Sequence, residues 1–186
     1  MDRIKDAMQQ IRRAAFLPLD QREFADMDRP LPIGHGQTNS QPSTVRKMLE
    51  WLAPDMGDKV LDVGSGSGWT TALLANLVGS RGFVYAVDRI PELVTMGRHN
   101  CTSQGIYNVE FKLAGDVIGL PDSKPYDRIL VSAGASHLPP ELLGQLSPGG
   151  RMVIPVGQDI LEVAMNTAGT EYEVIPHHGF IFVPLV

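Results

Sequence analysis

Cysteine is nearly absent from this chain, which has only Cys101 among its 186 residues. A single thiol cannot form an intramolecular disulfide and cannot build a multi-cysteine metal site. A reducing compartment, the cytoplasm, is therefore the expected location. The five histidines are not accompanied by carboxylates at the spacing of metal ligands, so we expect no metal.

An excess of positive charge is also missing. The formal net charge is -5 and the pI is about 5.5, which disfavours nucleic acid and anionic membrane as partners, because both attract clustered Lys and Arg. No apolar run approaches the roughly 18 residues that a membrane span needs. The amino-terminal stretch Met1-Asp-Arg-Ile-Lys-Asp is charged where a signal peptide would be apolar. We therefore expect no export and no membrane insertion.

Strand-like and helical patterns alternate through the middle of the chain. Before them, apolar spacing predicts a helix over 2–15 and another that starts at Pro42, with a long ordered loop at 16–39. The alternating elements are strands at 59–63, 82–87, 109–113, 128–132 and 151–156 and helices at 70–78, 92–103 and 140–146. This alternation indicates an α/β fold with a mostly parallel central sheet covered by helices on both faces.

The last part of the chain has short β-type runs with no helix between them. They lie at 160–165, 172–175 and 179–184, and they predict an antiparallel C-terminal edge of the sheet. The apolar content of 43% is enough for one core, so we expect a single domain. Its parts are amino-terminal helices and the loop at 1–58, an αβ core at 59–157 and C-terminal strands at 158–186.

A glycine-rich loop follows the first strand of the alternating region. The run Lys59-Val-Leu-Asp-Val leads into Gly64-Ser-Gly-Ser-Gly68 and then into a helix, a placement that lets backbone N–H groups face a ligand. Glycine-rich turns also join strands to helices for steric reasons alone. Asp88 ends the next strand, where a carboxylate can accept hydrogen bonds from the ribose of an adenosine cofactor, and Arg89 follows it in the same expected site. Asp88 as a solvated turn residue is the alternative.

The spacing of the glycines separates two adenosine cofactors. NAD-binding folds favour G-x-G-x-x-G, whereas this chain has G-x-G-x-G preceded by Asp62. The pattern resembles the first motif of class I S-adenosylmethionine-dependent methyltransferases. The resemblance implies that Asp62 holds the amino-acid part of S-adenosylmethionine, that Gly64, Ser65, Gly66 and Gly68 form its loop, and that Gly115-Asp116 holds adenine.

A second resemblance lies upstream of this loop. Pro32-Ile-Gly-His-Gly-Gln-Thr-Asn-Ser-Gln-Pro42 is similar to the P-I-G-x-G-Q-T-I-S-x-P stretch of protein-L-isoaspartate O-methyltransferases. Further segments agree with that family in order and spacing, at 60–68, 126–129, 138–157 and 179–185. The resemblance implies the three-layer Rossmann-like methyltransferase fold. It also implies methyl transfer to the side carboxylate of L-isoaspartyl residues in damaged proteins or peptides, leading to their repair.

Roles for three residues of the upstream stretch follow from the family. Ser40 takes the active-site role together with Thr38, and Gln37 lines the same pocket beside the cofactor. An isoaspartyl carboxyl has a pKa of about 4, so it arrives ionised and needs no strong base. Ser40 would position it by a hydrogen bond; its structural alternative is the N-cap of the following helix.

Two positions depart from the family pattern, and other functions stay open. Asn39 stands where the family has a hydrophobic residue, which predicts a polar contact in place of an apolar anchor, and Val186 stands where a threonine is frequent. The alternatives are a related carboxyl or peptide methyltransferase with another substrate, and a methyltransferase-like domain that binds without turnover. The acidic balance disfavours an RNA methyltransferase, and the glycine spacing disfavours an NAD enzyme.

Overall fold

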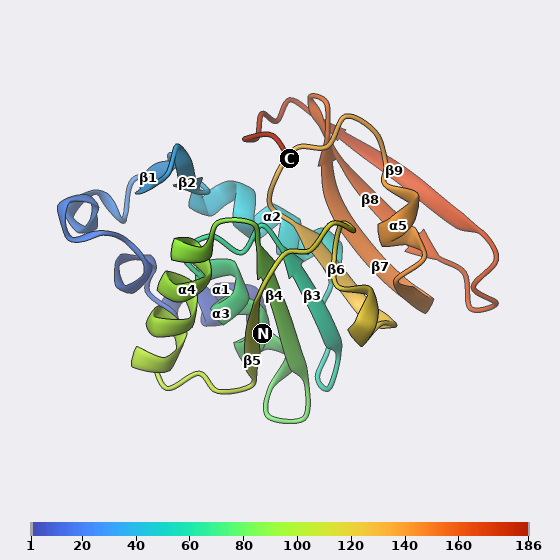
Figure 1. Cartoon of the computed structure of the whole chain (residues 1–186), viewed down its shortest axis with the longest axis horizontal. Helices are drawn as coiled ribbons and strands as arrows, with labels where there is room; N and C mark the ends of the chain where they lie inside the picture. Colours follow the sequence, from blue (N-terminus) through green and yellow to red (C-terminus); the bar gives the residue numbers. More distant parts are fainter. Residues whose placement is uncertain (1, 186) are drawn as a thin grey trace.

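The computed structural model describes residues 2–185, and its centre is one seven-stranded sheet (Figure 1). The strands are β3 (Lys59–Val63), β4 (Phe83–Asp88), β5 (Val109–Leu113), β6 (Tyr126–Val131), β7 (Leu146–Val156), β8 (Asp159–Met165) and β9 (Tyr172–His178). They are ordered β5-β4-β3-β6-β7-β8-β9. Neighbours from β5 to β7 pair in parallel, and β8 and β9 pair antiparallel. The predicted mostly parallel sheet with an antiparallel edge is confirmed.

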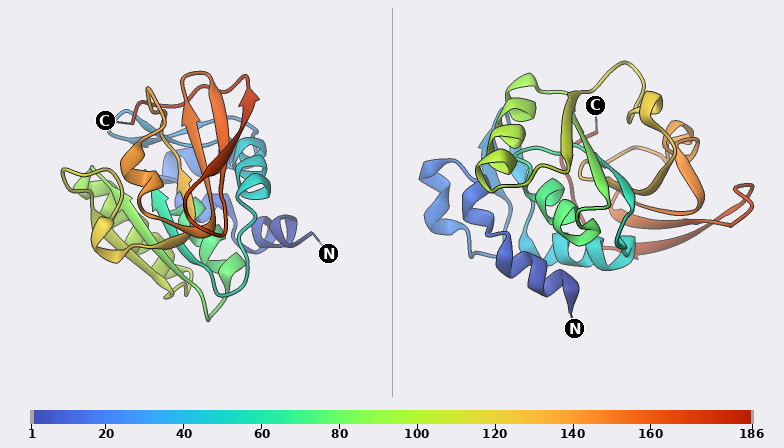
Figure 2. Two further views of the ribbon diagram at one scale, coloured as in Figure 1. Left: turned by 90° about the vertical axis from the view of Figure 1, so that its right-hand side faces the viewer. Right: turned by 90° about the horizontal axis from the view of Figure 1, so that it is seen from below.

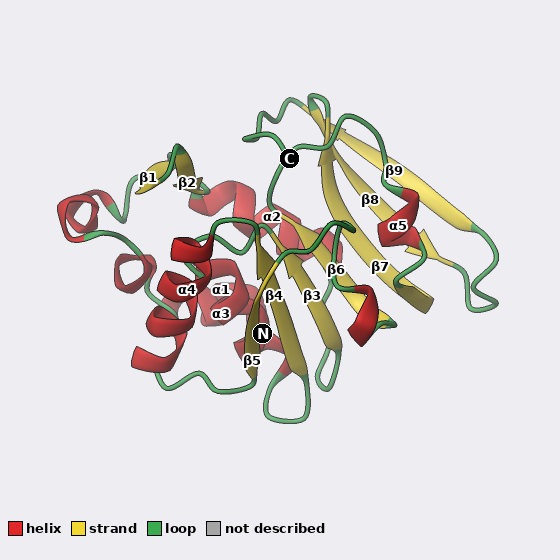
Figure 3. Ribbon diagram, viewed as in Figure 1, coloured by secondary structure: helices red, strands yellow, loops and turns green. Residues whose placement is uncertain are grey.

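Helices cover both faces of the sheet, but unequally. One face carries the larger ones, which are α1 (Arg3–Gln10), α2 (Pro42–Leu52), α3 (Trp69–Val78) and α4 (Pro91–Ser103). The other face carries the short α5 (Pro140–Leu143) and loops (Figure 3). Figure 2 shows α2 and α5 on opposite sides of the antiparallel strands. The layer on the face that carries α5 therefore consists mostly of irregular chain.

The central strands could be predicted from the sequence because the sheet is buried on both faces. Val60, Leu61, Ala86 and Ile129 are fully buried, so each of these strands contacts apolar groups above and below. Parallel strands of this kind appear as continuous apolar runs. The sheet is therefore built where the apolar runs predicted it.

The amino-terminal region differs from the predicted short helix over 2–15 and the long ordered loop over 16–39. Helix α1 ends at Gln10, because the carbonyl of Ile11 accepts a hydrogen bond from the indole of Trp69 at 3.0 Å and the chain then turns. Two 3₁₀ helices follow, η1 (Arg13–Phe16) and η2 (Leu19–Phe24), and then a hairpin of β1 (Leu31–Gly34) and β2 (Gln37–Asn39). Its turn places Gly34, His35 and Gly36 at positive φ. The prediction of an irregular loop over 16–39 was wrong at these elements.

Two further predictions at the C-terminal half also differ from the structure. The helix expected at 140–146 ends at Leu143, because Leu146 already begins β7 beside Tyr126 of β6. The run at 179–184 is not a strand of the sheet. Instead, Pro184 forms a single bridge with Gly134, so this segment crosses the carboxyl end of β6. It thereby reaches the same edge as the glycine-rich loop.

Candidate active site

A cleft of about 430 Å³ opens at the carboxyl ends of the parallel strands. This volume is typical of sites for small molecules. The cleft lies where the sheet order reverses, with β3 between β4 and β6, which is the usual place for ligands in open α/β sheets. The predicted site residues that line it are Gln37, Thr38, Ser40, Gly64, Ser65, Gly66, Asp88, Arg89, Gly115 and Asp116.

The glycine-rich loop forms the floor of this cleft. Gly64 and Gly66 have φ values of 76° and 53°, a left-handed conformation that glycine adopts at little cost. Between them, the hydroxyl of Ser65 is buried and has no hydrogen-bond partner among the described residues. A buried polar group in a ligand cleft is costly unless it is paired. Ser65 Oγ is therefore suited to a polar group of a bound ligand.

Asp62 lies beneath the residues that line the cleft, and its expected contact with the cofactor stays a prediction. Its side chain is fully buried and accepts hydrogen bonds at Oδ2 from Thr70 at 3.1 Å and Thr71 at 2.6 Å, while Oδ1 has no partner among residues 2–185. Burial raises the pKa of Asp62 to about 6. Alternation along β3 puts Asp62 on the same face as Val60, toward the helices. Only Thr70, which lines the cleft, connects Asp62 to a ligand there.

Gly68 is also outside the set of residues that line the cleft, and its expected contact with the cofactor stays a prediction. It is the N-cap of α3 with φ 88°. A Cβ atom at this position would lie 3.0 Å from the backbone of Gly97 in α4 and 3.2 Å from Phe111. The glycine at this position is therefore needed for close packing of α3 against α4 and β5.

The ends of β4 and β5 form one side wall. Asp88 is nearly buried, and its Oδ2 accepts a hydrogen bond from the N–H of Gly66 at 2.9 Å while Oδ1 accepts from the N–H of Ile90 at 3.0 Å. Arg89 lies next to it, and Gly115 and Asp116 follow β5. The structure thus brings together the acidic strand end and the segment predicted to hold adenine.

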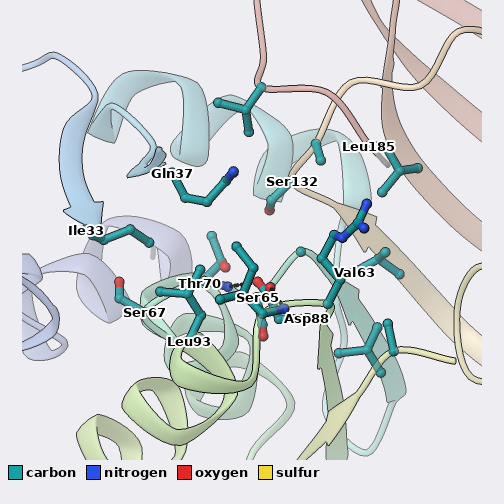
Figure 4. Close-up of a pocket in the computed structure, with 18 of the residues that line it drawn as sticks. Ile33, Gln37, Val63, Ser65, Ser67, Thr70, Asp88, Leu93, Ser132 and Leu185 are labelled. Carbon is teal, nitrogen blue, oxygen red and sulfur yellow. Dashed lines mark hydrogen bonds between the residues drawn. The ribbon is translucent and has the colours of Figure 1, made fainter. Parts of the chain in front are cut away.

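The β1–β2 hairpin forms the wall above the glycine-rich loop. In Figure 4 the Gln37 side chain lies on the opposite side of the cleft from Ser65 and Asp88. Thr38 and Ser40 line the same wall. Ser40 does not cap α2, because Gln41 occupies the N-cap position without a side-chain cap, and Asp28 Oδ1 accepts from the N–H of Ser43 at 2.9 Å. The N-cap alternative for Ser40 was therefore wrong.

Several cleft residues were not predicted from the sequence. Ile33 and Leu93 supply apolar contact surface, and Ser132 follows β6 at the carboxyl edge (Figure 4). The position of Ser132 at a strand end was a usable signal, because ligands bind at that edge. The segment 183–185 completes the rim, and no local pattern indicated that it would return to the site. Val186 lies outside the described residues.

Comparison with known proteins identifies the family. A family model described as protein-L-isoaspartate(D-aspartate) O-methyltransferase matches residues 1–186. The chain belongs to this family. A protein-L-isoaspartate O-methyltransferase of Aeropyrum pernix is 51% identical over 188 residues, which cover 99% of this chain and 72% of the relative. That of Methanothrix thermoacetophila is 45% identical over 185 residues, or 100% of this chain and 88% of the relative.

Solved structures agree with this assignment. A protein-L-isoaspartate O-methyltransferase has a TM-score of 0.88 at 27% identity, and the match covers 100% of this chain and 62% of that one. A Plasmodium falciparum structure in complex with S-adenosyl-L-homocysteine has the same fold, with a TM-score of 0.88 at 24% identity over 100% and 91% of the two chains. The predicted family, α/β fold, methyltransferase class and S-adenosylmethionine dependence of the family are confirmed.

Neither a membrane-spanning helix nor a metal-binding cluster occurs among the residues that the structure describes. Within residues 2–185, no helix has the length and apolar character needed to cross a membrane. In the same part of the chain, no cluster of three or more His, Cys, Asp or Glu side chains is arranged to hold a metal ion.

Proposed function

We propose that this protein transfers the methyl group of S-adenosylmethionine to the side carboxylate of L-isoaspartyl residues in damaged proteins, using the cleft at the carboxyl edge of the sheet. One observation carries the proposal. The strand Gln37–Asn39 and Ser40 face the glycine-rich loop across a single cleft of about 430 Å³. Cofactor and acceptor groups would therefore meet between the two walls.

The cofactor half of the cleft suits S-adenosylmethionine. Asp88 retains free lone pairs, because an ionised carboxylate has about four acceptor sites, and these suit the ribose hydroxyls. Ser65 Oγ offers an unpartnered buried hydroxyl, and Gly115 and Asp116 line the wall where adenine would lie. Asp62 would act on the amino-acid part through its electrostatic field and through Thr70. Its buried carboxylate lacks a partner at Oδ1, so a cationic ligand above it is favourable.

The reaction needs alignment more than proton transfer. When bound, S-adenosylmethionine supplies an electrophilic methyl group on a sulfonium sulfur. The isoaspartyl carboxylate has an ordinary pKa of about 4 and is already ionised at neutral pH. This carboxylate would accept the methyl group without a proton transfer, so the residues of the cleft would hold it in place and would not act as a base. Holding the reacting atoms at attack distance corresponds to effective molarities on the order of 10⁵ M or more.

Ser40 and Thr38 would perform this alignment on the acceptor side. Their hydroxyls can donate hydrogen bonds to a carboxylate, and both line the wall opposite the glycine-rich loop. The apolar groups of Ile33 and Leu93 on the same cleft would exclude water beside the reacting atoms. The chain then contributes position and hydrogen bonds, and the methyl ester formed would proceed through a succinimide to repair.

A matched pair of peptides tests the substrate. Purified protein with methyl-labelled S-adenosylmethionine should transfer base-labile label to an isoaspartyl peptide and leave the aspartyl peptide of the same sequence unlabelled. Equal labelling of both peptides, or labelling of neither, would contradict the proposal. Calorimetric titration with S-adenosylmethionine separates loss of cofactor binding from loss of acceptor recognition.

Several predictions about the whole molecule accompany this proposal. Its partners would be proteins or peptides that contain isoaspartyl residues, without nucleic acid or membrane. The cytoplasmic location and the single domain over 1–186 stay predictions. A size measurement in solution and fractionation of cells that contain the protein would test them.

A further inference from the structure

Arg13 is a buried cation that forms no salt bridge with any of residues 2–185. Its side chain is only 5% exposed, and within residues 2–185 no carboxylate oxygen lies within 4.0 Å of the guanidinium. Its Nη1 donates to the carbonyls of Ala25 and Met27 at 3.3 and 3.0 Å. Burying a charge is costly unless its hydrogen bonds are satisfied. Main-chain carbonyls of the segment that precedes the hairpin therefore act as neutral hydrogen-bond acceptors for Arg13.

The remaining donors of Arg13 reach the strand that carries the acceptor-side residues. Nη2 donates to the carbonyls of Asn39 and Ser40, each at 3.0 Å, and to that of Arg29 at 2.8 Å. Nε donates to Asn39 Oδ1 at 2.8 Å. Arg13 thus holds Asn39 by both its backbone and its side chain, and it holds the backbone of Ser40 directly.

Asn39 connects Arg13 to the glycine-rich loop through a further hydrogen bond. Its side chain is 6% exposed, and its Nδ2 donates to Ser67 Oγ at 3.1 Å. Ser67 is itself buried, and its carbonyl accepts from Asn100 Nδ2 of α4 at 2.9 Å. A continuous set of hydrogen bonds therefore joins the amino-terminal segment, the acceptor wall and the cofactor loop.

The restraint on Asn39 extends to its two neighbours in the chain, Thr38 and Ser40. Thr38 is exposed and Asn39 is buried, so their side chains lie on opposite faces of β2, and Ser40 follows the strand directly. Asn39 lies on the side toward the glycine-rich loop, where it donates to Ser67, and it lines the cleft together with Thr38 and Ser40. Displacement of Asn39 would move both hydroxyl groups together.

We infer that Arg13 and Asn39 are positioning residues, which set the separation of Ser40 and Thr38 from the cofactor loop by way of Ser67. The catalytic consequence rests on the proposed function above. A misplacement of about 1 Å by a change remote from the reacting atoms can cost about 100-fold in rate. Asn39 is therefore assigned a role that an apolar residue at this position would not reproduce in this chain, because Arg13 Nε and Ser67 Oγ would lose their partner.

Two substitutions of Asn39 separate positioning from simple packing. Asn39→Leu keeps the branched shape of the side chain but removes both polar contacts, and it should lower kcat by about 10- to 100-fold at a temperature where the variant is fully folded. Asn39→Asp retains an acceptor for Arg13 and can accept a hydrogen bond from Ser67, so it should restore most of kcat. Cofactor affinity, measured by calorimetry, should change little in either variant.

Asn76→Leu is the matched control, because Asn76 is exposed on α3 and bonds only the exposed Gln10 in this structure. It should leave kcat unchanged. Equal kcat for Asn39→Leu and the native protein, or equal losses for Asn39→Leu and Asn39→Asp, would overturn the assignment. So would a loss in Asn39→Leu that disappears when activity is expressed per folded molecule.

Hydrogen exchange gives a readout that needs no turnover. Ser67→Ala removes only the last contact of the set and should increase deuterium uptake at the amides of residues 37–40, while Asn76→Leu should not. Unchanged uptake in Ser67→Ala would overturn the positioning role even if Asn39→Leu fails to fold. If the native protein binds S-adenosylmethionine but does not methylate isoaspartyl peptide, the proposed function fails, and this exchange measurement still decides the structural coupling.

Discussion

The carboxylate of Asp88 accepts a hydrogen bond from the backbone N–H of Gly66, with Oδ2 2.9 Å from the nitrogen. The end of β4 therefore fixes the turn of the glycine-rich loop in addition to presenting a charge to the cleft. The other oxygen accepts from the N–H of Ile90, which starts the approach to α4. The ends of β3 and β4 and the approach to α4 are thus held by one side chain, which also lines the cleft.

Asp88→Ala should weaken S-adenosylmethionine binding. Two lost hydrogen bonds to ribose correspond to about 1 to 3 kcal/mol, and disorder of the Gly66 turn adds to this loss. Isothermal calorimetry measures the change. Asp26→Ala is the control, because the Asp26 side chain is 94% exposed and remote from the cleft lining. Unchanged affinity in Asp88→Ala would show that the ribose lies elsewhere.

Ser40→Ala should lower kcat without weakening cofactor binding. A hydrogen bond to a charged acceptor contributes about 1.5 to 3 kcal/mol, so a fall of about tenfold or more is expected. The melting temperature should stay close to the native value, because Ser40 does not cap α2. Steady-state kinetics with an isoaspartyl peptide, together with a thermal melt, checks both outcomes.

Ser43→Ala is the matched control for Ser40. Its N–H pairs with Asp28 at the start of α2, outside the residues that line the cleft, so kcat should be retained. A full kcat in Ser40→Ala combined with a lower melting temperature would contradict the positioning role. That result would return Ser40 to a structural role in the hairpin.

The central sheet was predictable because its strands obey a local rule. Strands buried on both faces form apolar runs, and β3 and β4 end at Asp62-Val63-Gly64 and at Asp88, where turn residues interrupt the runs. The glycine spacing and Asp88 then located the cleft at the carboxyl edge. Each of these signals depends on a few neighbouring residues. It can therefore be recognised in the sequence without knowing which distant segments are in contact.

The parts that were missed depend on contacts between distant segments. Arg13 reaches Asn39, and Asn39 reaches Ser67, only through the tertiary fold, and an isolated arginine in a helical pattern gives no sign of burial. The hairpin at 31–39 was obscured by its prolines and glycines. The position of Asp62 before Gly64 suggested a cofactor role, but the sequence did not predict that its side chain is buried against Thr71 of α3.

Gly68→Ala should destabilise the fold. The residue has φ 88°, and an added Cβ would lie 3.0 Å from the backbone of Gly97. Non-glycine residues in the left-handed region cost about 1 to 3 kcal/mol, and displacement of α3 from α4 adds to this. Chemical denaturation measures the loss. Gly144→Ala is the control, because Gly144 has φ -70° and its nearest neighbour would lie 3.5 Å away. Equal stability of the two variants would contradict the packing argument.

Asp62→Asn should stabilise the protein without cofactor at neutral pH. Burial raises the pKa of Asp62 to about 6 from an ordinary 3.8, so the folded state holds this proton more tightly than the unfolded chain. The free energy of unfolding therefore falls as pH rises through that window and stays lower above it. An asparagine avoids this cost, and a gain of about 1 to 3 kcal/mol is expected at about pH 7.5.

The same gain should shrink toward pH 4, where Asp62 is mostly protonated in the folded protein. Urea denaturation of both proteins across this range measures it, and a gain of equal size at both ends would contradict the titration. The variant should also bind S-adenosylmethionine more weakly, since the buried negative charge that favours a cationic ligand is gone. If this one substitution raises the stability of the protein and lowers its affinity for S-adenosylmethionine, the buried charge of Asp62 serves binding rather than folding.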